Sequence, residues 1–173
     1  LNPESIVELQ VEFKQDYMIN LYNSLSKNLY KNNIQPKGSE LYKQFKECSY
    51  DDVLVCFITP KPIVSYEQSI LWQYLSMIIE LNCYDGLHLN FEDNMDYLLK
   101  QNIIHVPMVM TDSKEIDHLH LGWQTFTKKV INYLSNSHNK ILFVYEDSTL
   151  EMLDGINFKK HDCCLLESDC LRK

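Results

Sequence analysis

An unbroken apolar run that ends in two closely spaced prolines constrains this chain more than any other feature. Six consecutive apolar residues occupy positions 53–58, and prolines follow at 60 and 62. Such a run is typical of a strand buried on both faces at the centre of a parallel sheet. Pro60 and Pro62 end the strand and hold Thr59 and Lys61 in extended geometry. Because open α/β sheets bind ligands at the carboxyl ends of their strands, we predict a binding loop at Lys61 and Pro62.

Helical and strand patterns alternate along the rest of the chain. Apolar residues at helical spacing predict helices over 6–30, 39–45, 67–81 and 123–134, with shorter helical segments at 93–101 and 149–153. Apolar runs predict further strands at 103–110, 141–145 and 162–166. Strands separated by helices of this length favour parallel pairing through right-handed crossovers. We therefore predict a three-layer α/β/α sandwich around a roughly four-stranded parallel sheet.

Composition limits the class of protein. We expect one domain over residues 1–173, with a core built from the 45% of residues that are hydrophobic. The formal charge of −8 weighs against a broad nucleic-acid surface, while a local basic patch stays open. The sequence has no apolar run long enough to predict a membrane span. The six cysteines form no C-x-x-C pair, which favours reduced thiols in an intracellular protein.

Three features contain residue types that carry chemistry. Two have metal-binding types without a complete ligand spacing: His118 with His120 among acidic residues, and His161 with Cys163, Cys164 and Cys170. We expect buried structural thiols, no metal and no cofactor. The third is Lys61, which is open to three interpretations: a nucleophile, a phosphate ligand or a solvated surface lysine. We favour the solvated lysine.

One motif is shared with a known family. Uracil-DNA glycosylases of family 1 begin a helix with L-G-W-E-x-F-T-D-x-V-I, and residues 121–131 here are LGWQTFTKKVI. Residues 34–55 are similar to the family's approach to its first strand, residues 140–145 to its V-V-F-L-L-W strand, and Lys160-His161 to its basic residues before the last strand. The resemblance covers residues 6–171 and implies the uracil-DNA glycosylase fold.

The resemblance places the family's water-activating loop, G-Q-D-P-Y-H-G, on residues 59–65. Only Pro62 matches that loop, and Lys61 stands where the family has its catalytic aspartate. A lysine there would repel the positive charge that develops on the sugar, whereas a carboxylate attracts it. The resemblance therefore implies that the catalytic position is degenerate.

At further positions too, this chain lacks the residue type that the family uses to bind or excise uracil. Pro107 takes the place of the asparagine that reads the uracil edge, and Glu167 the place of the histidine that meets the uracil oxygen. The segment carrying the uracil-stacking phenylalanine is missing after Ser65. Leu171 does match the leucine that family members insert into the duplex, and Arg172 follows it.

These comparisons lead us to expect a catalytically inactive protein with the uracil-DNA glycosylase fold. It would act as a protein-interaction scaffold in a replication, repair or chromosome-associated assembly, inside the cell at a site of DNA metabolism such as the nucleus. We expect a protein partner, weak DNA contact and no membrane, with a binding surface at Lys61, Pro62, Leu171 and Arg172.

Two alternatives remain. One is a divergent glycosylase that uses Lys61 and Glu167 in new roles. The other is a DNA-binding module without catalysis, which would hold the phosphate backbone through a set of basic side chains. That set comprises Lys61, Lys159, Lys160, Arg172 and Lys173.

Overall fold

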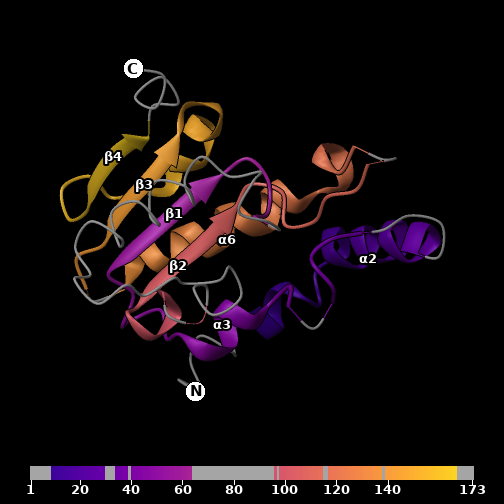
Figure 1. The fold of residues 1–173 in the computed structure, drawn as a ribbon, viewed down its shortest axis with the longest axis horizontal. Coiled ribbons are helices and arrows are strands. Elements are labelled where there is room, and N and C mark those ends of the chain that lie inside the picture. The colour runs from indigo at the N-terminus through magenta and orange to yellow at the C-terminus, as the bar shows by residue number, and fades with distance from the viewer. Residues whose placement is uncertain are drawn as a thin grey trace, which may run out of the picture.

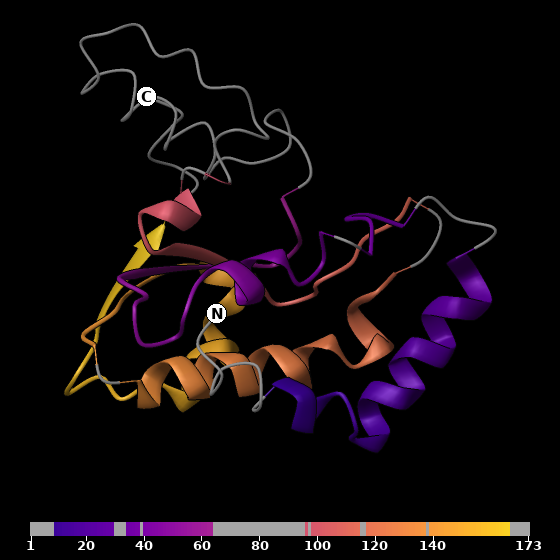
Figure 2. The same cartoon turned by 90° about the horizontal axis from the view of Figure 1, so that it is seen from below.

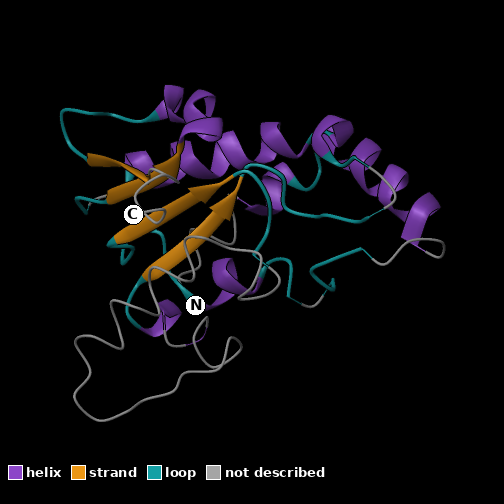
Figure 3. Ribbon diagram, turned by 45° about the horizontal axis from the view of Figure 1, so that its top comes forward, coloured by secondary structure: helices purple, strands orange, loops and turns teal. Residues whose placement is uncertain are grey.

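The computed structural model describes residues 9–29, 34–38, 40–63, 96, 98–114, 117–137 and 139–166. Within them, a four-stranded parallel sheet is flanked by helices (Figure 1). The strands, in the spatial order β2-β1-β3-β4, are β1 (Val55–Thr59), β2 (Ile103–Pro107), β3 (Leu142–Glu146) and β4 (Asp162–Leu166). The predicted fold class is confirmed, and Figure 3 shows the arrowheads lying toward the same end of the sheet.

Strand β1 is central, as its apolar run predicts. It pairs in parallel with β2 on one side and β3 on the other. The hydrogen-bonded strand starts at Val55, so Val53 and Leu54 lie before it, and Leu54 is half exposed. From Cys56 to Thr59 every side chain is buried. Both neighbours are needed to satisfy the backbone of a strand this apolar.

Helix α6 (Trp123–Asn136) covers one face of the sheet together with the 3-10 helix η3 (Asp147–Gly155) (Figure 2). The predicted apolar stripe of this helix is confirmed, because five of its side chains have no exposed surface: Trp123, Phe126, Val130, Ile131 and Leu134. The segment predicted as helical at 149–153 lies within η3 and has 3-10 geometry.

The edge of β2 is covered by helix α3 (Lys43–Glu47), where Gln44 Oε1 accepts a hydrogen bond from the His105 amide at 3.1 Å. The helix begins later than predicted: Tyr42 is its N-cap, without a side-chain capping bond, and Ser39, where the predicted helix began, lies outside the described residues. Leu41 precedes the helix and is nevertheless buried as expected. Packing therefore fixes this segment more than capping does.

The predicted helix over 6–30 is interrupted. A turn at 13–15, closed by bonds such as Gln15 N–H to the Glu12 carbonyl at 3.0 Å, separates the first helical residues from α2 (Asp16–Leu29). The Phe13 ring packs against Phe126 with centroids 6.0 Å apart. Buried Glu12 accepts hydrogen bonds from Tyr17 and Tyr133. These tertiary contacts override the continuous helical periodicity.

Other expectations are settled in part. Leu98 and Leu99 are buried and in helical conformation, as predicted for 93–101. The predicted helix at 67–81 lies outside the described residues. Strand β3 is less buried than its apolar sequence predicts, since Leu142 is 38% exposed. Among the described residues, no helix combines the length and apolarity that crossing a bilayer requires.

The aromatic cluster around Phe126 generates a stability prediction. Phe126 has no exposed surface and contacts the rings of Phe13, Tyr42, Phe45 and Trp123. Phe126→Ala should lower the free energy of unfolding by about 3–5 kcal/mol in urea denaturation, because it removes buried apolar area and leaves a cavity.

The matched control is Phe158→Ala, since Phe158 is 58% exposed. It should change the free energy of unfolding by no more than about 0.5 kcal/mol. Equal effects of the two substitutions would contradict the described core.

Candidate functional site at the carboxyl ends of the strands

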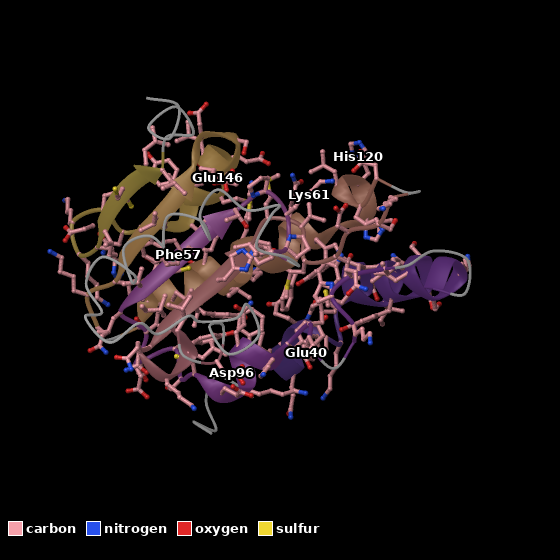
Figure 4. All side chains as sticks on the ribbon, in the orientation of Figure 1. Glu40, Phe57, Lys61, Asp96, His120 and Glu146 are labelled. Carbon is pink, nitrogen blue, oxygen red and sulfur yellow. The ribbon has the colours of Figure 1, made fainter. Side chains whose placement is uncertain are left out.

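The carboxyl ends of the four parallel strands lie along one side of the sheet, where this architecture usually binds ligands. This row of strand ends is called the edge of the sheet below. Lys61 and Pro62 follow β1, Pro107 ends β2, and Glu146 ends β3. Figure 4 shows Lys61 and Glu146 at this edge, with Phe57 farther back along β1. The structure thus brings together three of the sequence-predicted residues, Lys61, Pro62 and Pro107. Glu167, Leu171 and Arg172 lie outside the described residues.

A chain of hydrogen bonds fixes the loop that leaves β1. The Thr59 hydroxyl donates to the Lys61 carbonyl at 2.8 Å, and it lies 2.6 Å from His105 Nε2. A hydroxyl has one proton to donate, so Thr59 accepts from His105, whose Nε2 therefore carries the hydrogen. The chain connects the buried part of β2 to the backbone between the two prolines. It holds the Lys61 loop in one conformation.

His105 is neutral in this arrangement. Its side chain is buried, and burial lowers the pKa of His105 from its usual 6.5 to about 4. A neutral imidazole with hydrogen on Nε2 is the form that donates to Thr59. His105 was not singled out by sequence reasoning, because a lone histidine in an apolar run gives no local signal of its partner.

Lys61 forms an ion pair with Asp112. Lys61 Nζ lies 3.0 Å from Asp112 Oδ1, with the two side chains 64% and 33% exposed. Asp112 is itself held by two backbone hydrogen bonds to Gln35, of 2.9 and 2.8 Å. The exposure of Lys61 agrees with a surface lysine, and its charge is offset by a carboxylate that the sequence did not place beside it.

Glu146 is a second carboxylate at the edge. In the β1–β3 register Ile58 pairs with Tyr145, so Glu146 is the next position beside Thr59 and projects to the same face. Glu146 is half-buried, and this burial raises the pKa of its carboxyl above the usual 4.5. Sequence reasoning missed it, although a charged residue directly after the apolar run 141–145 is a usable signal.

His118 belongs to a buried network behind the edge. The Trp123 indole donates to the Thr111 hydroxyl at 2.6 Å, and that hydroxyl lies 2.7 Å from His118 Nδ1. His118 Nε2 in turn lies 3.1 Å from the Ser113 hydroxyl. Burial lowers the pKa of His118. Both ring nitrogens are engaged by hydroxyls, which does not favour the alternative in which His118 binds a metal.

The remaining clusters of the sequence do not assemble into a site within the described residues. In that part of the chain, no group of three or more histidine, cysteine or acidic side chains is arranged to hold a metal ion. Cys48 and Cys56 are buried free thiols, as expected, whereas the expectation of a buried thiol is wrong at Cys164, a free thiol of β4 that is exposed. Burial raises the pKa of Cys48 to about 11 and also raises that of Cys56, so both thiols stay protonated.

The basic residues proposed to hold a DNA backbone are not gathered in one place. Lys61 follows the carboxyl end of β1. Lys159 and Lys160 precede the amino end of β4, at the opposite ends of the strands. Lys160 donates a hydrogen bond to the Ser137 carbonyl. Arg172 and Lys173 lie outside the described residues. The described members therefore do not form one phosphate-binding surface.

Known proteins are similar to this chain in sequence and in fold. No family model matches it. It is 25% identical over 175 residues to "Uracil-DNA glycosylase 1" of Bacteroides fragilis, which covers 93% of this chain and 76% of the relative. It is 26% identical over 171 residues to "Uracil-DNA glycosylase 1" of Listeria innocua, covering 88% of this chain and 76% of the relative.

Solved structures agree in fold. The crystal structure of mimivirus uracil-DNA glycosylase superposes with a TM-score of 0.72 at 16% identity, over 95% of this chain and 67% of that one. The mimivirus UNG Y322L variant in complex with UGI gives a TM-score of 0.74 at 16% identity, over 95% and 69% of the two chains.

These findings contradict the expectation of an inactive scaffold. The relatives are named as enzymes, and the similarity extends over most of the chain. The expectation rested on four differences from the family pattern, at Lys61, Pro107, Glu167 and the missing phenylalanine segment, and of these the Lys61 charge is paired in the structure with the Asp112 carboxylate. The interpretation as a non-enzyme is contradicted with it.

The neutral His105 generates a prediction for stability against pH. The unfolded chain binds a proton near the usual pKa of 6.5, whereas the folded chain does so only near about 4. Stability should therefore be complete above pH 6.5 and should fall as the pH drops from 6.5 to 4, by about 3 kcal/mol from this residue.

Chemical denaturation at a series of pH values measures this loss, and His105→Gln should remove most of it. His120→Gln, which changes an exposed histidine, is the matched control and should keep the native profile. An NMR titration of native His105 with a midpoint near 6.5 would show that the residue is not buried as described.

Proposed function

Because the chain belongs to the uracil-DNA glycosylase-like superfamily, we propose that it is a divergent DNA glycosylase, which hydrolyses the bond between a base and its deoxyribose. The main support is the similarity to proteins named uracil-DNA glycosylase over most of the chain. A carboxylate at the ligand-binding edge of the sheet supplies the chemistry such a reaction needs. The protein would then act at a site of DNA metabolism.

Glu146 is the group we assign to water activation. Hydrolysis of a glycosidic bond needs a carboxylate that takes a proton from water and faces the positive charge on the sugar. Glu146 lies at the carboxyl end of β3, is half-buried, and has its pKa raised by that burial. A raised pKa makes a carboxylate a stronger general base. In the proposed step, the water oxygen bonds to C1′, its proton goes to Glu146, and the C1′–N bond breaks with its electron pair going to the base.

We assign Lys61 the role of contacting a phosphate group of the DNA backbone. Its ammonium is 64% exposed at the loop after β1, and lysine binds phosphate as a compact positive charge. Asp112 offsets part of this charge at 3.0 Å, so the sugar cation is not opposed by an unpaired lysine. The hydrogen bond from the Thr59 hydroxyl to the Lys61 carbonyl holds the backbone from which this side chain extends. The net charge of −8 makes such a local contact the expected mode of DNA binding.

The activity test uses duplexes that each carry one uracil, hypoxanthine or methylated purine, with base release measured as alkali-labile strand breaks. At least one duplex should be cleaved, and Glu146→Gln should lower the rate by about 10²–10⁴-fold, because the general base is lost. The native rate should rise with pH through a midpoint above 4.5, the usual carboxyl value.

Glu47→Gln, on the exposed surface of α3, is the matched control and should leave the rate unchanged. No release of any base would contradict the proposed function. Full activity of Glu146→Gln would remove Glu146 from the reaction and leave the function standing.

The phosphate contact is tested by the salt dependence of binding to a 20-base-pair duplex (roughly the length used for one protein site). Lys61→Gln should reduce the slope of log affinity against log salt by about 0.9, the value for one phosphate contact. It should change the free energy of unfolding by less than about 1 kcal/mol, since the ion pair with Asp112 is exposed.

Lys46→Gln, which removes an exposed lysine of α3, should keep the native slope. Equal slopes for the native protein and Lys61→Gln would show that Lys61 does not contact phosphate.

A further inference from the structure

The end of β2 presents an apolar group to the candidate site. Pro107 is buried and has neither an amide hydrogen nor a polar side chain. In the β1–β2 register Pro107 pairs with Thr59, so it lies on the same face of the sheet as Thr59 and Glu146. A base held against this face meets hydrocarbon on the β2 side and a carboxylate on the β3 side.

The backbone here is already hydrogen-bonded. The Met108 amide donates to the Thr59 carbonyl at 2.7 Å, and the Val109 amide donates to the Pro60 carbonyl at 3.2 Å. The Thr127 hydroxyl lies 3.1 and 3.2 Å from the carbonyls of Pro107 and Met108. Within this described stretch, both amide donors are thus used to extend the sheet. The stretch does not read the edge of a base by hydrogen bonds.

The uncharged donors behind the loop are engaged as well. His105 Nε2 donates to Thr59, and the Thr59 hydroxyl donates to the Lys61 carbonyl. Lys61 itself is exposed and paired with Asp112. The described part of this end of the sheet therefore carries the Glu146 carboxylate, while the Asp112 carboxylate is paired with Lys61 and the buried donors named here bond within the protein.

The charges and hydrogen-bond donors of this arrangement determine which kind of base leaves the sugar most readily. When the glycosidic bond breaks, its electron pair goes to the base. A neutral pyrimidine then leaves as an anion and needs hydrogen-bond donors to stabilise that charge. A purine alkylated on a ring nitrogen is already positively charged, leaves as a neutral molecule and needs none. Carboxylates attract such a cation before the bond breaks.

We propose that the site acts on positively charged bases, of the class formed when a purine is methylated at a ring nitrogen, in preference to neutral uracil. This inference rests on the proposed glycosylase function and specifies its substrate. In the reaction, water bonds to C1′ and gives its proton to Glu146. The C1′–N bond breaks with its electron pair going to the base, which neutralises the base and leaves an abasic deoxyribose. No oxidant, reductant or metal is required.

The experiment compares two duplexes of the same sequence under single-turnover conditions with enzyme in excess. One is treated with dimethyl sulfate, which produces N7-methylguanine and N3-methyladenine, and the other carries uracil. Released bases are separated by chromatography and corrected for spontaneous loss in a sample without protein, and the release is measured again with Glu146→Gln. Methylated purines should be released at least about 100-fold faster than uracil, since one missing donor to a developing anion costs about 10²–10³ in rate.

A pair of substitutions at one position tests the cause of this preference. Pro107→Asn places an amide group at the end of β2 and should narrow the ratio by raising uracil release. Pro107→Ala stays apolar and should keep the native ratio. Both variants are checked for folding by denaturation. If Pro107→Asn does not fold, the ratio of methylated-purine release to uracil release by the native protein still tests the proposal.

The outcomes separate the two proposals. Release of uracil, or of another neutral base, as fast as or faster than methylated purines would overturn this inference and leave the glycosylase function in place. Release of neither class, together with no release of hypoxanthine in the activity test, would overturn the glycosylase function itself. Preferential release of methylated purines that depends on Glu146 would support both.

Discussion

The position of β1 between β2 and β3 is the constraint on which the structure depends. Its buried backbone needs a hydrogen-bonded neighbour on each side, and because both neighbours here are parallel, the ends of all three strands are aligned. The prolines at 60 and 62 then stop the strand at the edge where ligands bind. The site therefore follows from the sheet. Lys61, Pro107 and Glu146 are far apart in sequence and share an edge because their strands share a direction.

The charges at this edge change the interpretation of the sequence. Taken alone, Lys61 at the position of a catalytic aspartate predicts a site of the wrong sign. In the structure Asp112 is paired with that lysine, and Glu146 brings a half-buried carboxylate to the neighbouring strand end. The sum of charges is then compatible with a reaction that develops positive charge on a sugar. A single substituted position did not determine the electrostatics of the site.

Whether a hydrogen-bond donor is available to a substrate also depends on its neighbours in the folded structure. The protein uses His105 and Thr59 to hold the Lys61 loop, and Trp123, Thr111 and His118 to hold the segment that carries Asp112. Groups that a sequence comparison would count as available donors are thus committed internally. This commitment is the physical basis for expecting a substrate whose departure needs little hydrogen bonding.

The sequence by itself determined the four strands and the buried stripe of α6, because apolar periodicity is a local property that each segment carries independently, and the helices between the strands predicted their parallel direction. It did not determine the break before α2, where the packing of Phe13 and buried Glu12 prevailed over helical spacing. Nor could it place Asp112 beside Lys61 or Glu146 beside Thr59. Those pairs exist only because the strands assemble in the order β2-β1-β3-β4, and strand order is a property of the whole chain.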